Sequence, residues 1–427
     1  PRVAVGREQQ TTQPATHNRC RSLPVGMNIA LGSSRLSRPT ATRGAGRNGS
    51  CTPADRPTSR LRHVTTAALL DFFNRNPRST SRVSGKKMIN IGSPDQPLMI
   101  SRMGCGTWNW GNQLLWGYSE DADAELEEVF NTCLDNGVNL FDTGDSYGTG
   151  RLKGRAEQLL GDFSIRRGIT GRENPNQICI GTKLAAYPWR LTPKSMVEAI
   201  RASGQRLQRE DGAFELGQMH WAPSSYGAGF QEEALLAGLC DAYDEGLIRA
   251  VGLSNFGPKS LRKVHRKLHA RGVPVATLQT QFSLLSYLDY QRATKEVCDE
   301  LGITLIAYSP LCLGLLGGKY TSADGGTFPP GPRGLLARSI LPAAEKSGLL
   351  PTLSEIAAQN KATNSQVALA WCIAKGAVPI PGAKNKRQCL QNIGALELKL
   401  SSGEMAALDE ASRSTKKSMV QNSMASS

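Results

Sequence analysis

Two hydrophobic patterns alternate along most of this chain. Short apolar runs, such as 138–143 and 178–183, are followed by longer segments in which apolar residues recur every three or four positions. One such segment carries its apolar residues on a single helical face, at Leu126, Val129, Phe130, Cys133 and Leu134. The first pattern is typical of buried strands and the second of amphipathic helices. We therefore expect strands and helices to alternate.

The body of the chain is predicted to hold eight strands, at 104–108, 138–143, 178–183, 216–221, 248–256, 275–282, 303–311 and 377–383. Helices are predicted at 119–137, 154–163, 192–209, 231–246, 258–272, 291–302, 353–360, 365–376 and 386–396. A β-hairpin at 88–104 precedes them, a Gly/Pro-rich segment fills 312–332, and an extra helix is predicted at 401–412. Eight strand–helix units over roughly 320 residues predict an α/β fold, a (β/α)8 TIM barrel.

Two other architectures receive little support from the sequence. A doubly wound sheet would carry a Gly-x-Gly-x-x-Gly turn after its first strand, and "GCGTWNWG" at 104–111 does not supply one. The longest apolar stretch, 305–318, is interrupted by Ser309, Pro310 and glycines. We therefore expect no transmembrane helix.

The charge of the chain is concentrated at its start. Residues 1–85 hold 14 Arg, no Lys and three acids, a net +11 that leaves only +4 of the total +15 for the other 342 residues. The near-balanced body argues against a nucleic-acid binder. The first segment is rich in Arg, Ser, Thr and Pro and lacks the apolar core of a secretory signal, which is typical of an organelle transit peptide; a generic disordered tail is the alternative.

These observations divide the chain into a disordered leader at 1–85 and a barrel domain at 86–427. The first residue is Pro1 rather than Met, so a further hypothesis is that translation starts at Met27. The ten cysteines include no C-x-x-C pair and no set with metal-ligand spacing. Six of them lie in apolar patterns and are predicted to be small buried hydrophobes: Cys105, Cys133, Cys179, Cys240, Cys298 and Cys372.

Candidate catalytic residues stand where three successive predicted strands end. Asp142, Lys183 and His220 end the second, third and fourth strands, and Tyr147 lies in the loop after the second. Each alone has an ordinary interpretation: a helix cap, a solvated ammonium, a structural imidazole and a cover for an apolar edge. Catalytic residues of a TIM barrel lie at the C-terminal ends of its strands, so we expect all four at one mouth.

These four side chains fit the reduction of a carbonyl. The reaction places a hydride on carbon and a proton on oxygen, and Tyr has a pKa of about 10. An adjacent Lys183 ammonium is expected to lower the pKa of Tyr147, while Asp142 holds Lys183 charged and oriented. His220 is expected to hydrogen-bond the carbonyl oxygen. This chemistry requires no metal.

The sequence resembles the aldo-keto reductase superfamily from about Lys86 to Met424. The resemblance rests on "GTW", "FDTGDSYGTG", "GRAEQLLG", "IGTK", "MHW", "VGLSNFGP", "QTQFSLL", "AYSPLCLGLLGGKY" and "VPIPGAKNKRQCLQNIGAL". "GNQLLWGY", "AYPWRLTP" and "GPRGLL" look like its plant and algal chloroplast branch, which favours a plastid over a mitochondrion. The resemblance implies the same tetrad of Asp142, Tyr147, Lys183 and His220, together with NADPH (NADP) as the coenzyme.

The resemblance also implies a set of coenzyme-binding residues. Ser254, Asn255 and Gln279 would hold the nicotinamide carboxamide, Tyr308 would stack on the ring, and Lys384 would pair with the 2′-phosphate. The backbone would wrap the pyrophosphate at Ser309, Pro310, Leu311, Gly314, Leu315 and Lys319. The resemblance further implies that Gln388 and Asn392 lie near the adenine. It also implies coenzyme contacts at Gly106, Thr107, Trp108 and Gly382. Some branches carry Arg where Gln388 stands, so this chain has one cation fewer than they do, and NADP is still favoured over NAD.

Four aromatic residues are predicted at the substrate mouth: Trp108, Trp116, Tyr187 and Trp221. Core packing is their ordinary interpretation. As a group they suit an apolar or aromatic carbonyl better than a sugar. The leading hypothesis is an NADPH-dependent reductase of small-molecule aldehydes or ketones. The alternative is a noncatalytic NADPH-binding, redox-sensing subunit.

Overall fold

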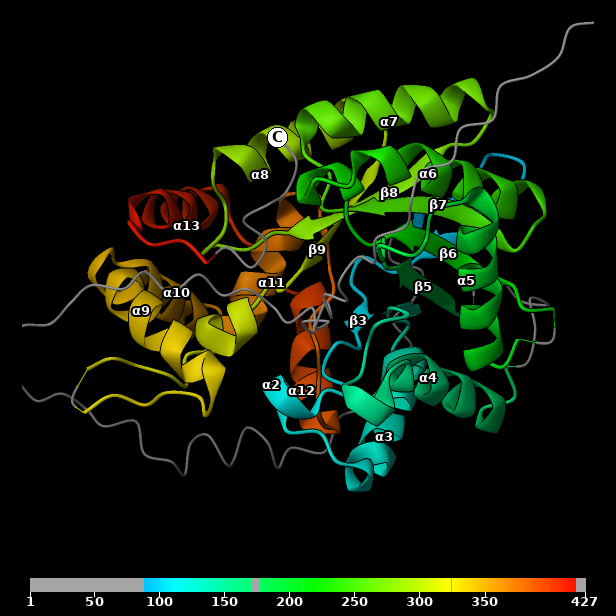
Figure 1. The fold of residues 1–427 in the computed structure, drawn as a ribbon. Helices are drawn as coiled ribbons and strands as arrows, with labels where there is room; N and C mark the ends of the chain where they lie inside the picture. Colours follow the sequence, from blue (N-terminus) through cyan, green and yellow to red (C-terminus); the bar gives the residue numbers. More distant parts are fainter. Residues whose placement is uncertain (1–87, 170–176, 210, 324, 420–427) are drawn as a thin grey trace, which may run out of the picture. The chain divides into compact units, whose positions relative to one another are not determined.

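Eight parallel strands form the centre of the fold in the computed structural model, which describes residues 88–169, 177–209, 211–323 and 325–419 (Figure 1). They pair in sequence order: β3 (Cys105–Gly106), β4 (Leu140–Asp142), β5 (Cys179–Leu184), β6 (Phe214–Met219), β7 (Ile248–Ser254), β8 (Val275–Gln281), β9 (Thr304–Tyr308) and β10 (Val378–Pro379). Backbone bonds from Gly104 N to Pro379 O (2.9 Å) and from Gly106 N to Pro381 O (3.2 Å) join the first strand to the last. The predicted barrel is confirmed; the predicted leader, 1–85, lies outside the described residues.

Helices follow the strands as the periodicity predicts. They are α3 (Asp123–Asp135), α4 (Arg155–Arg166), α5 (Pro193–Arg206), α6 (Gly229–Asp244), α7 (Pro258–Ala270), α8 (Asp289–Glu300), α11 (Asn364–Ala374) and α12 (Lys386–Ile393), with the extra α13 (Ser402–Ser414). Local chemistry sets their ends. At the start of α5, Thr192 accepts a hydrogen bond from Ser195 N, and Pro193 occupies the first turn, where no backbone donor is needed.

Helix α9 was not predicted. The structure has α9 (Pro332–Lys346) ahead of α10 (Leu349–Gln359), where the predicted Gly/Pro-rich segment ends at 332 and residues 333–346 had no predicted element. The sequence did not predict this helix because it contains Gly334 and Pro342, and both residue types disfavour helix interiors. The buried residues nevertheless follow helical spacing, at Ala337, Ile340, Leu341 and Ala344. Helices α9, α10 and α13 lie together beside the barrel (Figure 1).

The barrel interior is apolar at one end and polar at the other. Its apolar layer consists of Leu140, Cys179, Leu216, Ala250, Ile306, Val378 and Ile380. The predicted hairpin, β1 (Ile89–Asn90) and β2 (Met99–Ile100), packs Ile100 and its neighbours against this layer and closes the N-terminal end. Alternate residues of a strand point the same way. Asp142, two residues after Leu140, therefore points into the barrel at the opposite end.

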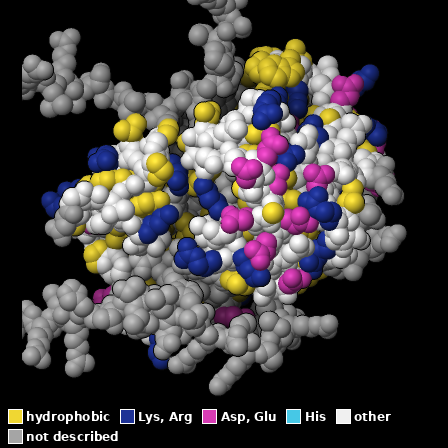
Figure 2. Space-filling view, turned by 90° about the horizontal axis from the view of Figure 1, so that it is seen from below, with side chains coloured by type: hydrophobic (Ala, Val, Ile, Leu, Met, Phe, Trp, Pro, Cys, Tyr) yellow, Lys and Arg dark blue, Asp and Glu magenta, His cyan; other side chains and the backbone are white. Residues whose placement is uncertain are grey.

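Charges on the outer helices are largely paired. Arg201 contacts Glu245 at 2.6 Å and Arg166 contacts Glu127 at 2.8 Å, for example. Figure 2 shows acidic and basic side chains interspersed over the described part of one face. Within the described residues, no helix is long and apolar enough to cross a membrane.

Candidate active site

A buried ion pair lies at the polar end of the barrel. Lys183 on β5 donates to Oδ1 of Asp142 on β4, and the two side chains are only 1% and 4% exposed. The other carboxylate oxygen accepts from Gln279 Nε2 at 2.6 Å and from Gln218 Nε2 at 3.2 Å. Burial lowers the pKa of Lys183, and the Asp142 carboxylate opposes that shift. Asp142 therefore lies where it can hold the ammonium in place.

Tyr147 is brought back over the barrel by a tight turn after β4. Its N–H bonds to Gly144 O at 3.0 Å, and its carbonyl accepts from Gly154 N at 2.7 Å. Gly148 follows with φ +111°, and a Cβ there would lie 1.8 Å from Leu152 O, so only glycine fits. The Tyr147 ring centroid lies 4.9 Å from Lys183 Nζ.

The electrostatics of Tyr147 differ from the prediction. Burial, and then the negative charge of Asp142, raise the pKa of Tyr147 well above its ordinary value of about 10. The sequence argument, that an adjacent Lys183 lowers this pKa, was wrong because it left out the desolvation of the phenol and the effect of the Asp142 charge on Tyr147 itself. Tyr147 consequently holds its proton at neutral pH.

His220 completes the constellation directly after β6. Its ring centroid lies 6.0 Å from that of Tyr147 and 4.8 Å from that of Trp221. Its Nδ1 is buried without a hydrogen-bond partner among the described residues. Burial, with a contribution from Lys183, lowers the pKa of His220 to about 3. The ring is therefore a neutral imidazole, able to donate one hydrogen bond without carrying charge.

The residues expected around the nicotinamide form a connected polar group. Tyr308 Oη donates to Asn255 Oδ1 at 3.0 Å, and Asn255 Nδ2 donates to Ser254 Oγ at 3.1 Å and to His220 O at 3.2 Å. Asn255 has φ +58°, a conformation that Asn tolerates better than most residues. Gln279 has a further role that the sequence did not reveal, because its amide is engaged by Asp142.

The segment after β9 has an unusual backbone that suits an anion. Positive φ angles occur at Ser309, Cys312, Leu313 and Gly314, within and before the 3-10 helix η4 (Cys312–Gly317). Strained turns of this kind cluster at functional sites and can aim successive N–H groups at one oxyanion. Pro310 and Leu315 are buried, whereas Leu311 is half-buried and Lys319 is exposed.

Two cations, Lys384 and Arg333, lie beside Trp116 in the short helix α2 (Gln113–Trp116). Lys384 Nζ donates to the Trp116 carbonyl, and the Arg333 guanidinium lies 4.5 Å from its ring centroid. Burial, and then the charges of Arg333 and Lys319, lower the pKa of Lys384. The Nε atoms of Arg333 and Trp116 are buried without described partners. This group fits a phosphate, and sequence reasoning missed Arg333, a lone cation in "GPRGLL".

Other residues assigned to the coenzyme support the loops of the site. Gln388 Oε1 accepts from Lys384 N at 3.0 Å, and Asn392 Nδ2 donates to Gly382 O at 3.4 Å, so both amides brace the loop that carries Lys384. Thr107 Oγ1 donates to Asp142 O at 2.9 Å. Gly106 lies so near Ile380 that a Cβ added at position 106 would be 2.7 Å from the carbonyl oxygen of Ile380.

The four mouth aromatics form two pairs. Trp108 meets Trp116 edge-on with centroids 6.0 Å apart, and Tyr187 meets Trp221 edge-on at 6.4 Å. Trp221 also contacts the His220 ring, which places the second pair beside the tetrad. The stacked partner of Tyr187, Trp189 at 4.5 Å, was not predicted and is 64% exposed.

Two further residues of the site escaped the sequence interpretation. Gln218 lies two positions before His220, on the same side of β6, and that spacing was a usable signal. Asp145, which had no assigned role, is buried, pairs with Arg190 Nη1 at 2.7 Å and accepts from Ala185 N. It therefore joins the Tyr147 loop to the loop after β5.

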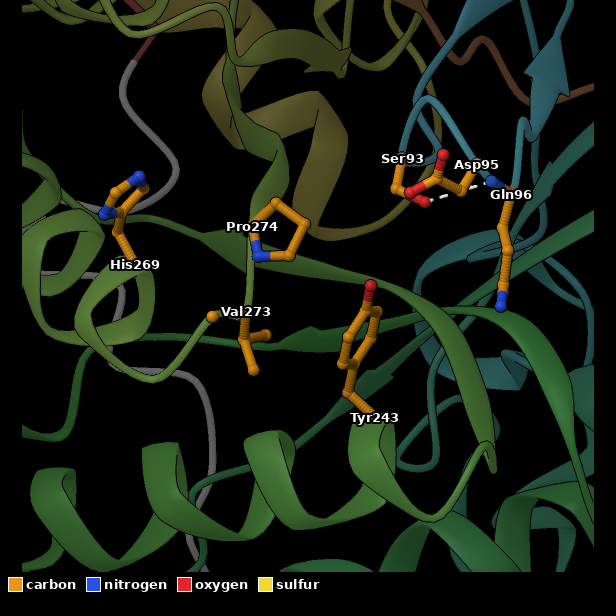
Figure 3. A pocket seen from close by; sticks show the side chains of 8 residues that line it. Ser93, Asp95, Gln96, Tyr243, His269, Val273 and Pro274 are labelled. Carbon is orange, nitrogen blue, oxygen red and sulfur yellow. Dashed lines mark hydrogen bonds between the residues drawn. The ribbon is translucent and has the colours of Figure 1, made fainter.

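A second concavity lies away from this site. Ser93 and Gln96 of the hairpin, Tyr243 near the end of α6 and His269 near the end of α7 surround a cavity of about 560 Å³ (Figure 3). Its remaining lining, around Val273, leads into the start of β8. These are N-terminal strand ends, opposite to Asp142 and Lys183.

Comparison of the sequence with known proteins identifies relatives of this chain. Residues 102–413 match the family model described as the Aldo/keto reductase family. A chloroplastic pyridoxal reductase from Arabidopsis thaliana is 52% identical over 76% of this chain and 87% of its own length. A probable aldo-keto reductase from Glycine max is 28% identical over 74% of this chain and 86% of its own.

Solved structures agree at the level of the fold. A thermostable aldo-keto reductase in complex with the inhibitor epalrestat has a TM-score of 0.58 and 26% identity, and covers 76% of this chain and 99% of that one. A Bombyx mori aldo-keto reductase in complex with NADP has a TM-score of 0.54 at 19% identity, over 76% and 92% of the two chains.

Proposed function

The chain belongs to the aldo/keto reductase family, and from that premise we propose that it reduces an aromatic aldehyde of the pyridoxal type, with NADPH as hydride donor and Tyr147 as proton donor. Family membership makes it an oxidoreductase acting on carbonyls. The buried Asp142–Lys183 pair beneath the Tyr147 ring is the observation that carries the assignment of roles.

The residues around the site fit an extended dinucleotide. Bound NADPH supplies the hydride. Tyr308 and Asn255 would hold the nicotinamide end, and the positive-φ segment after β9 would receive the pyrophosphate. Lys384 and Arg333 would receive the 2′-phosphate. The unpartnered Nε of Arg333 supports this assignment, because a buried polar atom without a partner costs free energy that an anion would recover.

Proton transfer is assigned to Tyr147 because of its state and position. A raised pKa keeps the phenol protonated, and Lys183 lies close enough to stabilise the phenolate as the proton leaves. His220 is neutral and can orient the carbonyl oxygen through one N–H. Asp142 keeps Lys183 charged in its buried position.

Two observations support the proposed substrate class: the aromatic side chains near His220 and the activity of a similar protein. Trp221 lies beside His220, and Tyr187 meets Trp221 edge-on, so a flat heteroaromatic aldehyde would find edge and face contacts there. The Arabidopsis thaliana protein that is 52% identical is a pyridoxal reductase. A noncatalytic NADPH-binding subunit is not favoured, because the tetrad is complete. We also propose a chloroplast location, supported by the composition of 1–85 and by the chloroplastic relative.

Substitution of Tyr147 by Phe tests this proposal. NADPH oxidation with pyridoxal should fall by about 10²-fold or more, the usual contribution of general acid catalysis, while NADPH binding is kept. Tyr290→Phe, a substitution on α8, is the matched control and should behave as the parent. Parental turnover in Tyr147→Phe would show that another group donates the proton. Absence of turnover with pyridoxal, alongside reduction of other aldehydes, would contradict the substrate class.

A further inference from the structure

Three thiols meet beneath the loop that carries Lys384. Cys105 lies on β3, Cys133 on α3 and Cys389 on α12, and all three are buried. The Sγ atoms of Cys133 and Cys389 are 3.4 Å apart. A cavity of about 10 Å³ touches all three residues, roughly the room that one water molecule requires. A space of about the size of one water molecule therefore adjoins all three cysteines.

Neither ordinary role of a cysteine cluster accounts for these thiols. Catalysis by the tetrad makes no use of them. Across the described residues, no group of three or more His, Cys, Asp or Glu is arranged to hold a metal ion. Simple packing explains one buried thiol, as at Cys298, but does not require two sulfurs in contact between elements 256 positions apart in sequence.

We propose that Cys133 and Cys389 are an oxidisable pair, which a hydroperoxide converts into a disulfide that fastens α12 to α3. The separation of the two sulfurs, 3.4 Å, needs only a small change. A disulfide has an S–S length of about 2.05 Å, so the two sulfurs must approach by little more than one ångström. Cys105 is the third thiol, able to compete for Cys133.

The step is a two-electron oxidation by hydrogen peroxide. Cys389 sulfur attacks one peroxide oxygen, forming an S–O bond and breaking the O–O bond, and the leaving oxygen departs as water with the thiol proton. Cys133 sulfur then attacks the sulfenic sulfur, forming the S–S bond and releasing the second oxygen as water with the second thiol proton. Two thiols and one peroxide give one disulfide and two waters. The hydrogen bond with Cys133 lowers the pKa of Cys389, which suits Cys389 as the first to react.

The disulfide would act on the coenzyme site through α12. Helix α12 carries Gln388, which accepts from Lys384 N, and Asn392, which donates to Gly382 O. A displacement of Cys389 toward α3 therefore moves both braces of the Lys384 loop. This consequence rests on the proposed function, whereas formation of the disulfide does not.

The experiment uses the full reduced chain, hydrogen peroxide, thiol alkylation and peptide mapping. A Cys133–Cys389 cross-linked peptide, reversed by dithiothreitol, supports the proposal. A Cys105–Cys133 link, or free thiols at both positions under peroxide that oxidises other cysteines, overturns it. The NADPH dissociation constant should rise by roughly fivefold or more on oxidation, the lower end of ordinary coupling between two sites. A linked protein with an unchanged dissociation constant overturns the coupling.

Matched variants separate this pair from general oxidation. Cys389→Ala and Cys133→Ala should bind NADPH as the reduced parent does and lose the peroxide effect. Cys298→Ala, which removes a buried cysteine from α8, should keep that effect. Persistence of the effect in both pair variants overturns the assignment. Failure of the reduced parent to bind NADPH would refute the proposed function and leave the mapping result unaffected.

Discussion

Replacement of Asp142 by Asn should be unusually destabilising, although the two side chains have nearly the same shape. Asp142 presents two accepting oxygens to three donors: Lys183, Gln279 and Gln218. Asn has one accepting oxygen, so at least one donor is left without an acceptor. The substitution also leaves the Lys183 ammonium, which is 1% exposed, without a counter-ion.

The expected loss is about 3–5 kcal/mol in the free energy of unfolding, the usual cost of removing one partner of a buried ion pair. Domains of ordinary stability unfold at a cost of about 5–15 kcal/mol, so the variant would lose a large part of its margin. Lys183→Met added to Asp142→Asn should restore about 1 kcal/mol or more, because it removes the buried charge that the first change left unpaired.

Urea unfolding at pH 7, followed by tryptophan fluorescence, measures these differences. Glu245→Gln is the control, since it breaks a half-exposed pair with Arg201 and should cost less than about 1 kcal/mol. Two results would contradict this reasoning. One is a loss of unfolding free energy in Asp142→Asn no larger than that in Glu245→Gln, and the other is a double variant less stable than Asp142→Asn. Either result would show that burial of the pair does not make Asp142 essential to stability.

Three other outcomes follow from the structure. Lys384→Ala should weaken NADPH binding about tenfold or more and NADH binding far less, because a 2′-phosphate contact is a charge-assisted bond; equal losses in titrations of the two coenzymes would place that phosphate elsewhere. His220, with a pKa of about 3 in the native protein and about 6.5 when unfolded, should reduce stability as pH falls from 6.5 toward 3, because only the unfolded state then gains the proton. His220→Asn should flatten the pH dependence of the urea midpoint over that range, and an unchanged slope would assign the effect to other groups. Gly148→Ala should lower stability and slow reduction, since its Cβ would lie 1.8 Å from Leu152 O, and parental values in both assays would show that the turn relaxes freely.

The sequence predicted the site to the extent that its residues lie at strand ends. Asp142, Lys183 and His220 could be placed at one mouth because the carboxyl ends of eight parallel strands meet there. Arg333 was missed because its role depends on Trp116, which is far away in the sequence. Gln218 was missed although its spacing from His220 was a usable signal, because its contact with Asp142 appears only in the folded barrel. Helix α9 was missed because Gly334 and Pro342 disfavour a helix that tertiary packing nevertheless stabilises.

Tyr147 shows what the sequence determines and what only the tertiary structure decides. The residue type and the spacing from Asp142 are properties of the chain, and they suffice to predict a tyrosine beside a lysine. The direction of its pKa shift is decided by tertiary structure, because desolvation and the orientation of the Asp142 carboxylate depend on how β4, β5 and the turn at Gly148 pack. The sequence by itself determined the order of strands, helices and chemical groups. Only the folded barrel decided which of those groups lie within a few ångströms of one another, and electrostatic interactions depend on that distance and on burial.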